Sequence, residues 1–136
     1  MTENPGIEVS EKDGKLLAIV IRRTATAAAT QFITPTGCSQ QLGFVVYKSG
    51  TSIPRHEHLP VSRSLIGTTE VVFVREGRCT VDIFDSNREL FRQFDLGPGD
   101  AIFLNGGGHG FRVHEDTVLF EVKQGPFTSG PEKVRF

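Results

Sequence analysis

The stretch that decides the fold is residues 70–84, which read EVVFVREGRCTVDIF. Two runs rich in β-branched and aromatic residues, 71–74 and 79–84, flank residues 75–78, which contain Gly77. β-Branched and aromatic side chains favour strands, and a short connection with a glycine is typical of a hairpin. We therefore predict a β-hairpin over these residues and read the rest of the chain outward from it.

Short strand patterns recur on both sides of residues 70–84. The apolar run 15–21 (KLLAIVI) suits a strand that is covered on both faces, and residues 41–49 alternate between apolar and polar. Further strands are expected at 90–94, 101–104, 111–114 and 117–123, with turn residues such as 85–87 between them. Only the alanine-rich segment 24–32 leaves a helix open. This pattern predicts an all-β sandwich, barrel or jelly roll as a single domain, 1–136.

The composition excludes several classes of partner. The chain has 136 residues, with 15 Lys and Arg against 16 Asp and Glu, and its formal net charge is −1. A neutral chain without a basic cluster argues against nucleic-acid binding, and no apolar run approaches the roughly 18–20 residues that span a bilayer. Cys38 and Cys79 are too few for a disulfide framework, and no secretory signal is visible. We expect a reduced, cytoplasmic protein that binds neither nucleic acid nor membrane.

Two histidines suggest a metal site. His56 and His58 flank Glu57. On a strand, residues two apart point to the same face, so both imidazoles would project together, and neutral imidazole is the commonest metal ligand in proteins. A solvated pair of histidines would show the same pattern.

Glu70 and His109 are further candidate ligands. Glu70 opens an apolar strand, and if it faces the core it must be paired, hydrogen-bonded or bound to a metal. Otherwise it is an exposed strand end. His109 follows three glycines, which permit close backbone approach and could bring this histidine over another strand. The alternative is a flexible hairpin with an incidental histidine. His114, five residues on, would face away, and we treat it as a surface or supporting residue.

These positions resemble the motifs of the cupin superfamily. The first motif, Gly, five residues, His-x-His, a short spacer, Glu, six residues and Gly, is matched by Gly50, His56, His58, Glu70 and Gly77. The spacer differs, since residues 59–69 replace the usual three or four, and we interpret them as a loop inserted at the mouth of a barrel.

The second cupin motif is matched more loosely. Gly99 opens it, but Asn105 stands where Pro is usual, and His109 comes one residue early. The resemblance covers about residues 41–124. A narrower similarity, carried by GGHGF at 107–111, VKQGPF at 122–127 and KVRF at 133–136, is to a group of small bacterial cupins that lack an established reaction. Some members of that group occur among genes for surface-polysaccharide synthesis. Residues 128–136 are expected to form a C-terminal arm.

The resemblance implies a fold and a metal centre. The fold would be a cupin-type double-stranded β-helix, a jelly-roll barrel in one domain, and cupins favour homodimers. His56, His58, Glu70 and His109 would bind one divalent transition metal, and three imidazoles with one carboxylate suit Fe, Mn, Ni, Co, Cu or Zn. Four protein ligands on an octahedral ion would leave two positions for water or substrate.

Several functions fit this expectation. One is a metal-dependent enzyme on a small oxygenated substrate such as a sugar or sugar nucleotide, acting as an isomerase or epimerase, or as an Fe-dependent dioxygenase. The alternative is a non-catalytic metal- or sugar-binding module; a purely structural protein with a vestigial site is least favoured. Arg63, in the inserted loop, is the candidate for gripping an anionic or polar substrate, although a solvated loop arginine would look the same. Lys123 is a weaker candidate, and no catalytic residue is assigned.

Overall fold

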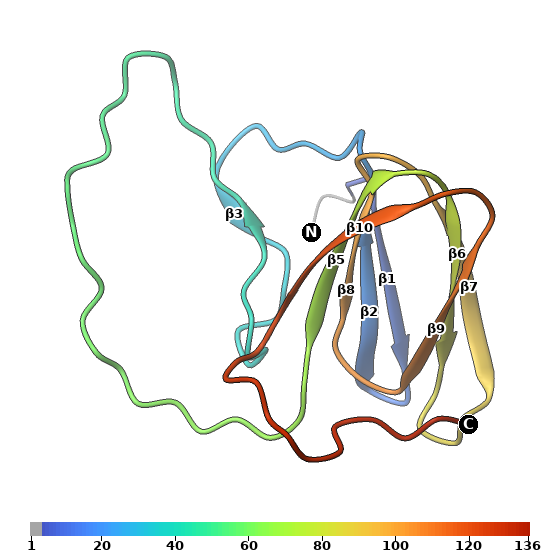
Figure 1. Ribbon diagram of the computed structural model, residues 1–136. Coiled ribbons are helices and arrows are strands. Elements are labelled where there is room, and N and C mark those ends of the chain that lie inside the picture. Colours follow the sequence, from blue (N-terminus) through green and yellow to red (C-terminus); the bar gives the residue numbers. More distant parts are fainter. Residues whose placement is uncertain (1–3) are drawn as a thin grey trace. The chain divides into compact units, whose positions relative to one another are not determined.

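A computed structural model describes residues 4–136, and in these residues every regular element is a strand (Figure 1). The all-β prediction is therefore confirmed. The strands are β1 (Ile7–Lys12), β2 (Lys15–Ile21), β3 (Gln31–Phe32), β4 (Gly43–Phe44), β5 (Glu70–Glu76), β6 (Cys79–Phe84), β7 (Leu90–Leu96), β8 (Ala101–Leu104), β9 (Gly108–Val113) and β10 (Val118–Lys123).

The chain divides into two compact units. The first comprises the residues up to Ala25 together with Thr68–Phe136, and the second is Thr26–Gly67. The first unit contains two antiparallel sheets, one with the strand order β1-β2-β8-β5-β10 and one with the order β7-β6-β9. Both sheets are open, with β1, β10, β7 and β9 at their edges, so neither closes into a barrel. The arrangement is compatible with a β-sandwich.

Figure 1 shows the two sheets of the first unit, and the buried side chains of its core lie between them. Alternation within each strand sends every second side chain inward, and most of these inward side chains are apolar. Strand β8 contributes most per residue, because all four of its side chains are buried. The inward cluster consists of Leu17, Ala18, Val20, Val72, Val74, Cys79, Val81, Ile83, Phe94, Leu96, Ile102 and Leu104.

The stretch 70–84 forms two strands as predicted, but the predicted hairpin is wrong. Strand β5 pairs with β8 and β10, whereas β6 pairs with β7 and β9, so the connection at Gly77 crosses from one sheet to the other. Gly77 adopts a φ of 85°, and the carbonyl of Arg78 accepts a hydrogen bond from the backbone N–H of His114. A hairpin would need a free edge on both strands, and both edges of each are already paired.

The other expected strands of the first unit are confirmed with small shifts of their ends. Residues 15–21 and 101–104 have the expected bounds, and the remaining three become Leu90–Leu96, Gly108–Val113 and Val118–Lys123. The predicted turn at 85–87 joins β6 to β7. Its Asp85 carboxylate accepts hydrogen bonds from the backbone N–H groups of Asn87 and Glu89, at 2.8 and 3.0 Å. The Asx-type bonding expected of a turn aspartate is thus present.

The second unit contains less strand than the sequence predicts. Of residues 41–49, only Gly43–Phe44 form a strand, which pairs with Gln31–Phe32. The segment 24–32, where a helix was left open, contains no helix. A strand exists only where a neighbour supplies ladder hydrogen bonds, and alternation alone does not supply that neighbour. The expected inserted loop, residues 59–69, has no regular structure.

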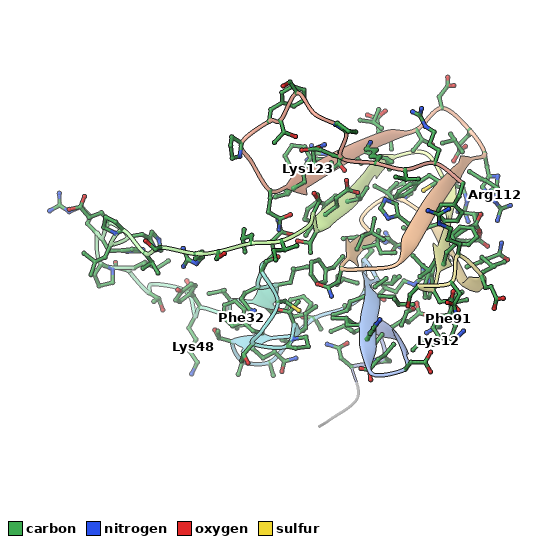
Figure 2. All side chains as sticks on the ribbon, turned by 90° about the horizontal axis from the view of Figure 1, so that it is seen from below. Lys12, Phe32, Lys48, Phe91, Arg112 and Lys123 are labelled. Atoms are coloured by element: carbon green, nitrogen blue, oxygen red, sulfur yellow. The ribbon has the colours of Figure 1, made fainter. Side chains whose placement is uncertain are left out.

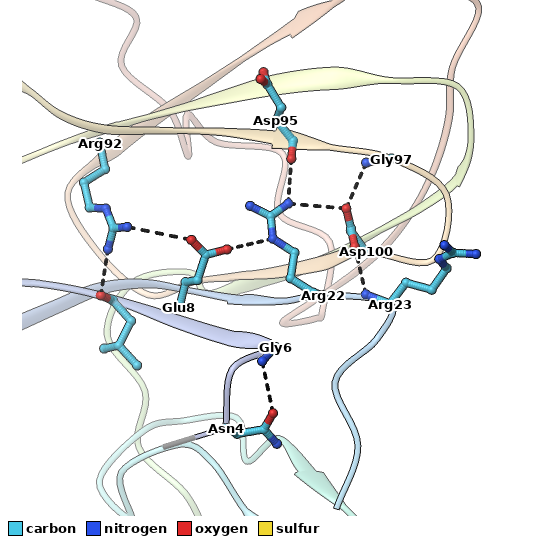
Figure 3. A network of polar contacts seen from close by, with 10 residues as sticks. Asn4, Gly6, Glu8, Arg22, Arg23, Arg92, Asp95, Gly97 and Asp100 are labelled. Carbon is cyan, nitrogen blue, oxygen red and sulfur yellow. Dashed lines mark hydrogen bonds and ion pairs between the residues drawn. The ribbon is translucent and has the colours of Figure 1, made fainter. Parts of the chain in front are cut away.

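A polar network ties the first two strands to the connection between β7 and β8 (Figure 3). The Arg22 guanidinium donates to Glu8 at 2.7 Å and to the carbonyl oxygen of Asp95 at 2.6 Å. The Asp100 carboxylate accepts from the backbone N–H of Arg23 at 2.8 Å and lies 3.4 Å from Arg22. These contacts hold one end of the sandwich together, because strands far apart in sequence share the same charged groups.

A second polar contact fastens the β6–β7 turn to β1. The Lys12 ammonium pairs with the Asp85 carboxylate and lies 5.6 Å from the centre of the Phe91 ring, and Figure 2 labels both Lys12 and Phe91. Hydrogen bonding from Lys12 and from the turn backbone lowers the pKa of Asp85. Asp85 therefore stabilises the fold while it is ionised, and this contribution is lost as the pH falls through its depressed pKa.

Residues 4–136 include no helix long and apolar enough to cross a bilayer.

Replacing Gly77 by Ala should destabilise the protein more than the same change at Gly14. Both glycines have positive φ, but a Cβ on Gly14 would meet nothing within 4 Å, whereas a Cβ on Gly77 would lie 2.3 Å from the Thr117 hydroxyl oxygen. We expect Gly14→Ala to cost about 1–2 kcal/mol for the left-handed conformation. Gly77→Ala should cost roughly a further 1–3 kcal/mol for the overlap. Chemical denaturation of both variants measures the difference, and equal losses would contradict the packing argument.

Candidate metal centre

Glu70 faces the core side of its sheet. It begins β5, and alternation places it on the same face as Val72 and Val74, which belong to the inward cluster. Its side chain is only 12% exposed. The sequence leaves open whether Glu70 faces the core or is an exposed strand end. The structure shows the first, with the carboxylate at the margin of the core.

His109 approaches Glu70 from the other sheet. It lies on β9 opposite Ile83 of β6, and its Nε2 atom is 3.3 Å from the Glu70 carboxylate. The glycines before it allow a close approach, since a Cβ on Gly107, whose φ is 66°, would lie 2.2 Å from the carbonyl oxygen of Phe84. The expectation that this loop brings His109 over another strand is confirmed.

The pKa values of Glu70 and His109 shift in the directions opposite to those that an ion pair would produce. Burial raises the pKa of Glu70, and the hydrogen bond and charge of Glu121 raise it further, while Lys123 and Lys133 oppose them. Burial and the charge of Lys133 lower the pKa of His109. An ion pair would lower the carboxyl pKa and raise that of the imidazole. The contact is therefore between a carboxyl group that resists ionisation and a neutral imidazole.

Two charged residues of β10 complete the surroundings of Glu70. The register pairs Lys123 with Glu70 and Glu121 with Val72, so both β10 side chains lie on the inward face, at the edge of the sheet. Strand alternation in the sequence predicts that Glu121 and Lys123 share a face. That they flank Glu70 was missed, because the pairing of β10 with β5 joins residues about fifty positions apart.

Hydrogen bonds join the residue before β5 to the residue after β10. The Gln124 side chain accepts a hydrogen bond from the backbone N–H of Thr69 and donates one to its hydroxyl, both at 2.6 Å. Thr69 is buried. This two-point contact sets the position of the residue immediately before Glu70, and so limits the movement of the carboxylate.

His56 and His58 lie together within the second unit. Their ring centres are 5.4 Å apart at an angle of 71°. The imidazoles are therefore neighbours as predicted, although residues 56–58 are not in a strand. The His56 Nδ1 atom lies 2.9 Å from the carbonyl oxygen of Pro54. Because a carbonyl oxygen only accepts, Nδ1 carries the proton, which leaves the Nε2 lone pair available to a metal.

Arg63 and His114 take no part in the Glu70–His109 and His56–His58 pairs. Arg63 is exposed in the second unit and forms no hydrogen bond or ion pair with any residue from 4 to 136. His114 lies on the outward face of the smaller sheet, where its Nε2 atom is 2.6 Å from the Thr80 hydroxyl. His114 is thus a surface residue, in accord with its odd offset from His109.

The structure brings Glu70 to His109 within one unit, and His56 to His58 within the other. No three His, Cys, Asp or Glu side chains among the described residues gather closely enough to hold a metal ion. The donor chemistry still fits a transition metal, because a carboxylate in a costly environment and neutral imidazoles are the groups that such a metal stabilises.

No protein-family model matches the chain, and no curated protein or solved structure matches it either.

Glu70→Gln should stabilise the metal-free protein near neutral pH. The raised pKa means that ionised Glu70 opposes folding, and protonation relieves this as the pH falls through the folded-state pKa. The thermal midpoint of Glu70→Gln should therefore exceed that of the wild type by a few degrees at pH 7, with a smaller gain at pH 4. Glu76→Gln, at the exposed end of the same strand, serves as the control and should change little. A lower midpoint for Glu70→Gln at pH 7 would contradict the prediction.

Proposed function

We propose that the protein has a cupin-type jelly-roll fold and binds one divalent transition metal through His56, His58, Glu70 and His109. The observation that carries this proposal is the 3.3 Å approach of His109 to Glu70 between two strands of different sheets. A carboxyl group at the margin of an apolar core is destabilised when ionised, and a bound cation would remove that penalty. Metal-binding sites commonly carry such groups at the expense of stability.

The histidines of the second unit support the same proposal. His56 and His58 present two imidazoles side by side, and the bond from His56 to Pro54 leaves the Nε2 lone pair of His56 available to a metal. With Glu70 and His109 they make the three-imidazole, one-carboxylate set that the cupin resemblance implies. This set fits Fe, Mn, Ni, Co, Cu or Zn.

We propose further that the protein is a metal-dependent enzyme on a small oxygenated substrate, such as a sugar or sugar nucleotide. When bound, the metal would act as a Lewis acid towards substrate oxygens or, as iron, would support dioxygenation. The chain's own charges near Glu70 suit the first role. The Lys123 and Lys133 ammonium groups exert a positive potential at Glu70, and would stabilise negative charge that develops on a neighbouring oxygen.

A non-catalytic metal- or sugar-binding module is the alternative. It would use the same ligands, so metal binding is tested first and turnover second.

Protein purified without added metal should contain close to one transition-metal ion per chain by elemental analysis. His58→Ala and His109→Ala should each lose most of it, because loss of one of four ligands typically lowers the affinity of a site at least about 10- to 100-fold. His114→Ala is the matched control, since it removes an exposed imidazole outside the ligand set, and its metal content should equal that of the wild type. Absence of metal from the wild type, before and after incubation with Fe, Mn, Ni or Zn, would sink the metal-centre proposal.

Turnover separates the enzymatic reactions from simple binding. Fe-loaded protein that consumes oxygen only in the presence of a sugar or sugar nucleotide would identify a dioxygenase. Exchange of a substrate C–H proton with deuterated solvent, without oxygen consumption, would identify an isomerase or epimerase. Metal-loaded protein that binds the sugar without either reaction would favour the binding module.

A further inference from the structure

The arm 128–136 and the end of β10 line an open hollow of about 400 Å³ on the surface of the first unit. This volume lies within the range of roughly 300–1,000 Å³ that small-molecule sites occupy. Its charged lining consists of three cations, Lys123, Lys133 and Arg135, against one carboxylate, Glu132. Figure 2 labels Lys123, the last residue of β10, which precedes the arm by five positions. The hollow is thus predominantly cationic, although the chain as a whole is nearly neutral.

The three cations form no close ion pair in the part of the chain that the structure describes. The ion pairs among residues 4–136 use Lys12, Arg22, Arg92, His109 and Arg112, and none involves Lys123, Lys133 or Arg135. Glu132 instead accepts a hydrogen bond from the Thr128 hydroxyl within the arm. Lys123 and Lys133 act electrostatically on Glu70, but none of the three cations forms an ion pair with a carboxylate. A bound anion would therefore still stabilise the cations that gather in the hollow.

Phe136 holds the far end of the arm on the first unit. Its ring lies 5.2 Å from that of Phe84 and 5.1 Å from the Arg88 guanidinium. It also packs against Gly108, where an added Cβ would lie 2.6 Å from the ring. The backbone that carries Lys133 and Arg135 is therefore attached at one end to β10 and at the other to this aromatic contact.

The hollow adjoins the proposed metal ligands. Lys123 is the register partner of Glu70, and the charge of Lys133 acts on both Glu70 and His109. An anionic group held by these cations would bring the remainder of its molecule to Glu70 and His109.

We propose that this hollow binds the phosphate group of an organic phosphate, through Lys123, Lys133 and Arg135. Its assignment to the substrate rests on the proposed metal centre. A phosphate monoester carries close to two negative charges at neutral pH and has three acceptor oxygens, which suit three cations better than the single charge of a carboxylate does. The planar guanidinium of Arg135 can donate two parallel hydrogen bonds to it. Exposed Phe127, on the same lining, offers an apolar surface for the organic part.

Calorimetric titration of metal-free protein at constant ionic strength tests the proposal with inorganic phosphate, pyrophosphate and acetate. We expect saturable binding of the first two, tighter for pyrophosphate, and much weaker binding of acetate. Lys133→Ala and Arg135→Ala should each weaken phosphate binding by about fivefold or more, as expected when one charged hydrogen-bonding partner is lost. Lys15→Ala removes the same charge from an exposed position on β2 and should have no effect.

Phe136→Ala separates a built site from general attraction. It changes no charge but releases the anchor of the arm, so phosphate affinity should fall although the cations remain. Each variant is checked by thermal unfolding, so that a folding defect is not mistaken for a binding defect. Equal losses in Lys15→Ala and Lys133→Ala, or binding that does not saturate, would overturn the proposal.

Metal content keeps this proposal separate from that of the metal centre. Lys133→Ala and Arg135→Ala should retain the metal of the wild type while they lose phosphate affinity. If they lose the metal as well, the arm acts on the metal ligands and the phosphate assignment is wrong. A wild type that takes up no metal on incubation with Fe, Mn, Ni or Zn, yet binds phosphate, would contradict the metal centre and leave the phosphate site supported.

Discussion

The pairing of β5 on both of its edges is the constraint on which the first unit depends. Because β8 and β10 occupy these edges, the chain after Gly77 has to leave the sheet and start a second one. The same pairing turns Val72 and Val74 inward and brings Glu70 to the margin of the core. Burial between the two sheets then makes the carboxylate costly to ionise, so the fold and the chemistry of the candidate centre have one origin.

The ionisable groups of the candidate centre lower the stability of the folded protein. Glu70 resists ionisation, His109 resists protonation, and Glu121 adds a like charge beside Glu70. Lys123 and Lys133 partly compensate, yet neither forms an ion pair within residues 4–136. Natural proteins retain such local conflicts mainly at functional sites. The proposed metal would supply positive charge beside Glu70, and the proposed phosphate would supply negative charge beside Lys123 and Lys133.

Much of the strand content could be predicted, whereas the partnerships could not. The run at residues 15–21 is apolar throughout, and it forms a strand with those bounds because it lies between β1 and β8. Residues 41–49 show a similar alternation but form strand only at Gly43–Phe44, where Gln31–Phe32 supply a ladder. At the candidate centre, the glycines before His109 and the apolar run after Glu70 were enough to single out these two residues as candidates. No sequence feature indicated Glu121, because its position beside Glu70 depends on the register of β10 against β5.

The sequence by itself determined most strands of the first unit, several of the turns between them, and that Glu70 opens an apolar strand. These properties follow from side-chain branching, glycine and alternation, which act over a few neighbouring residues. Only the tertiary structure decided that β5 and β6 separate into two sheets, that His109 approaches Glu70, and that Lys123 lies beside it. Those outcomes depend on hydrogen bonds and packing between segments far apart in the chain, for which no short stretch of sequence specifies the partner.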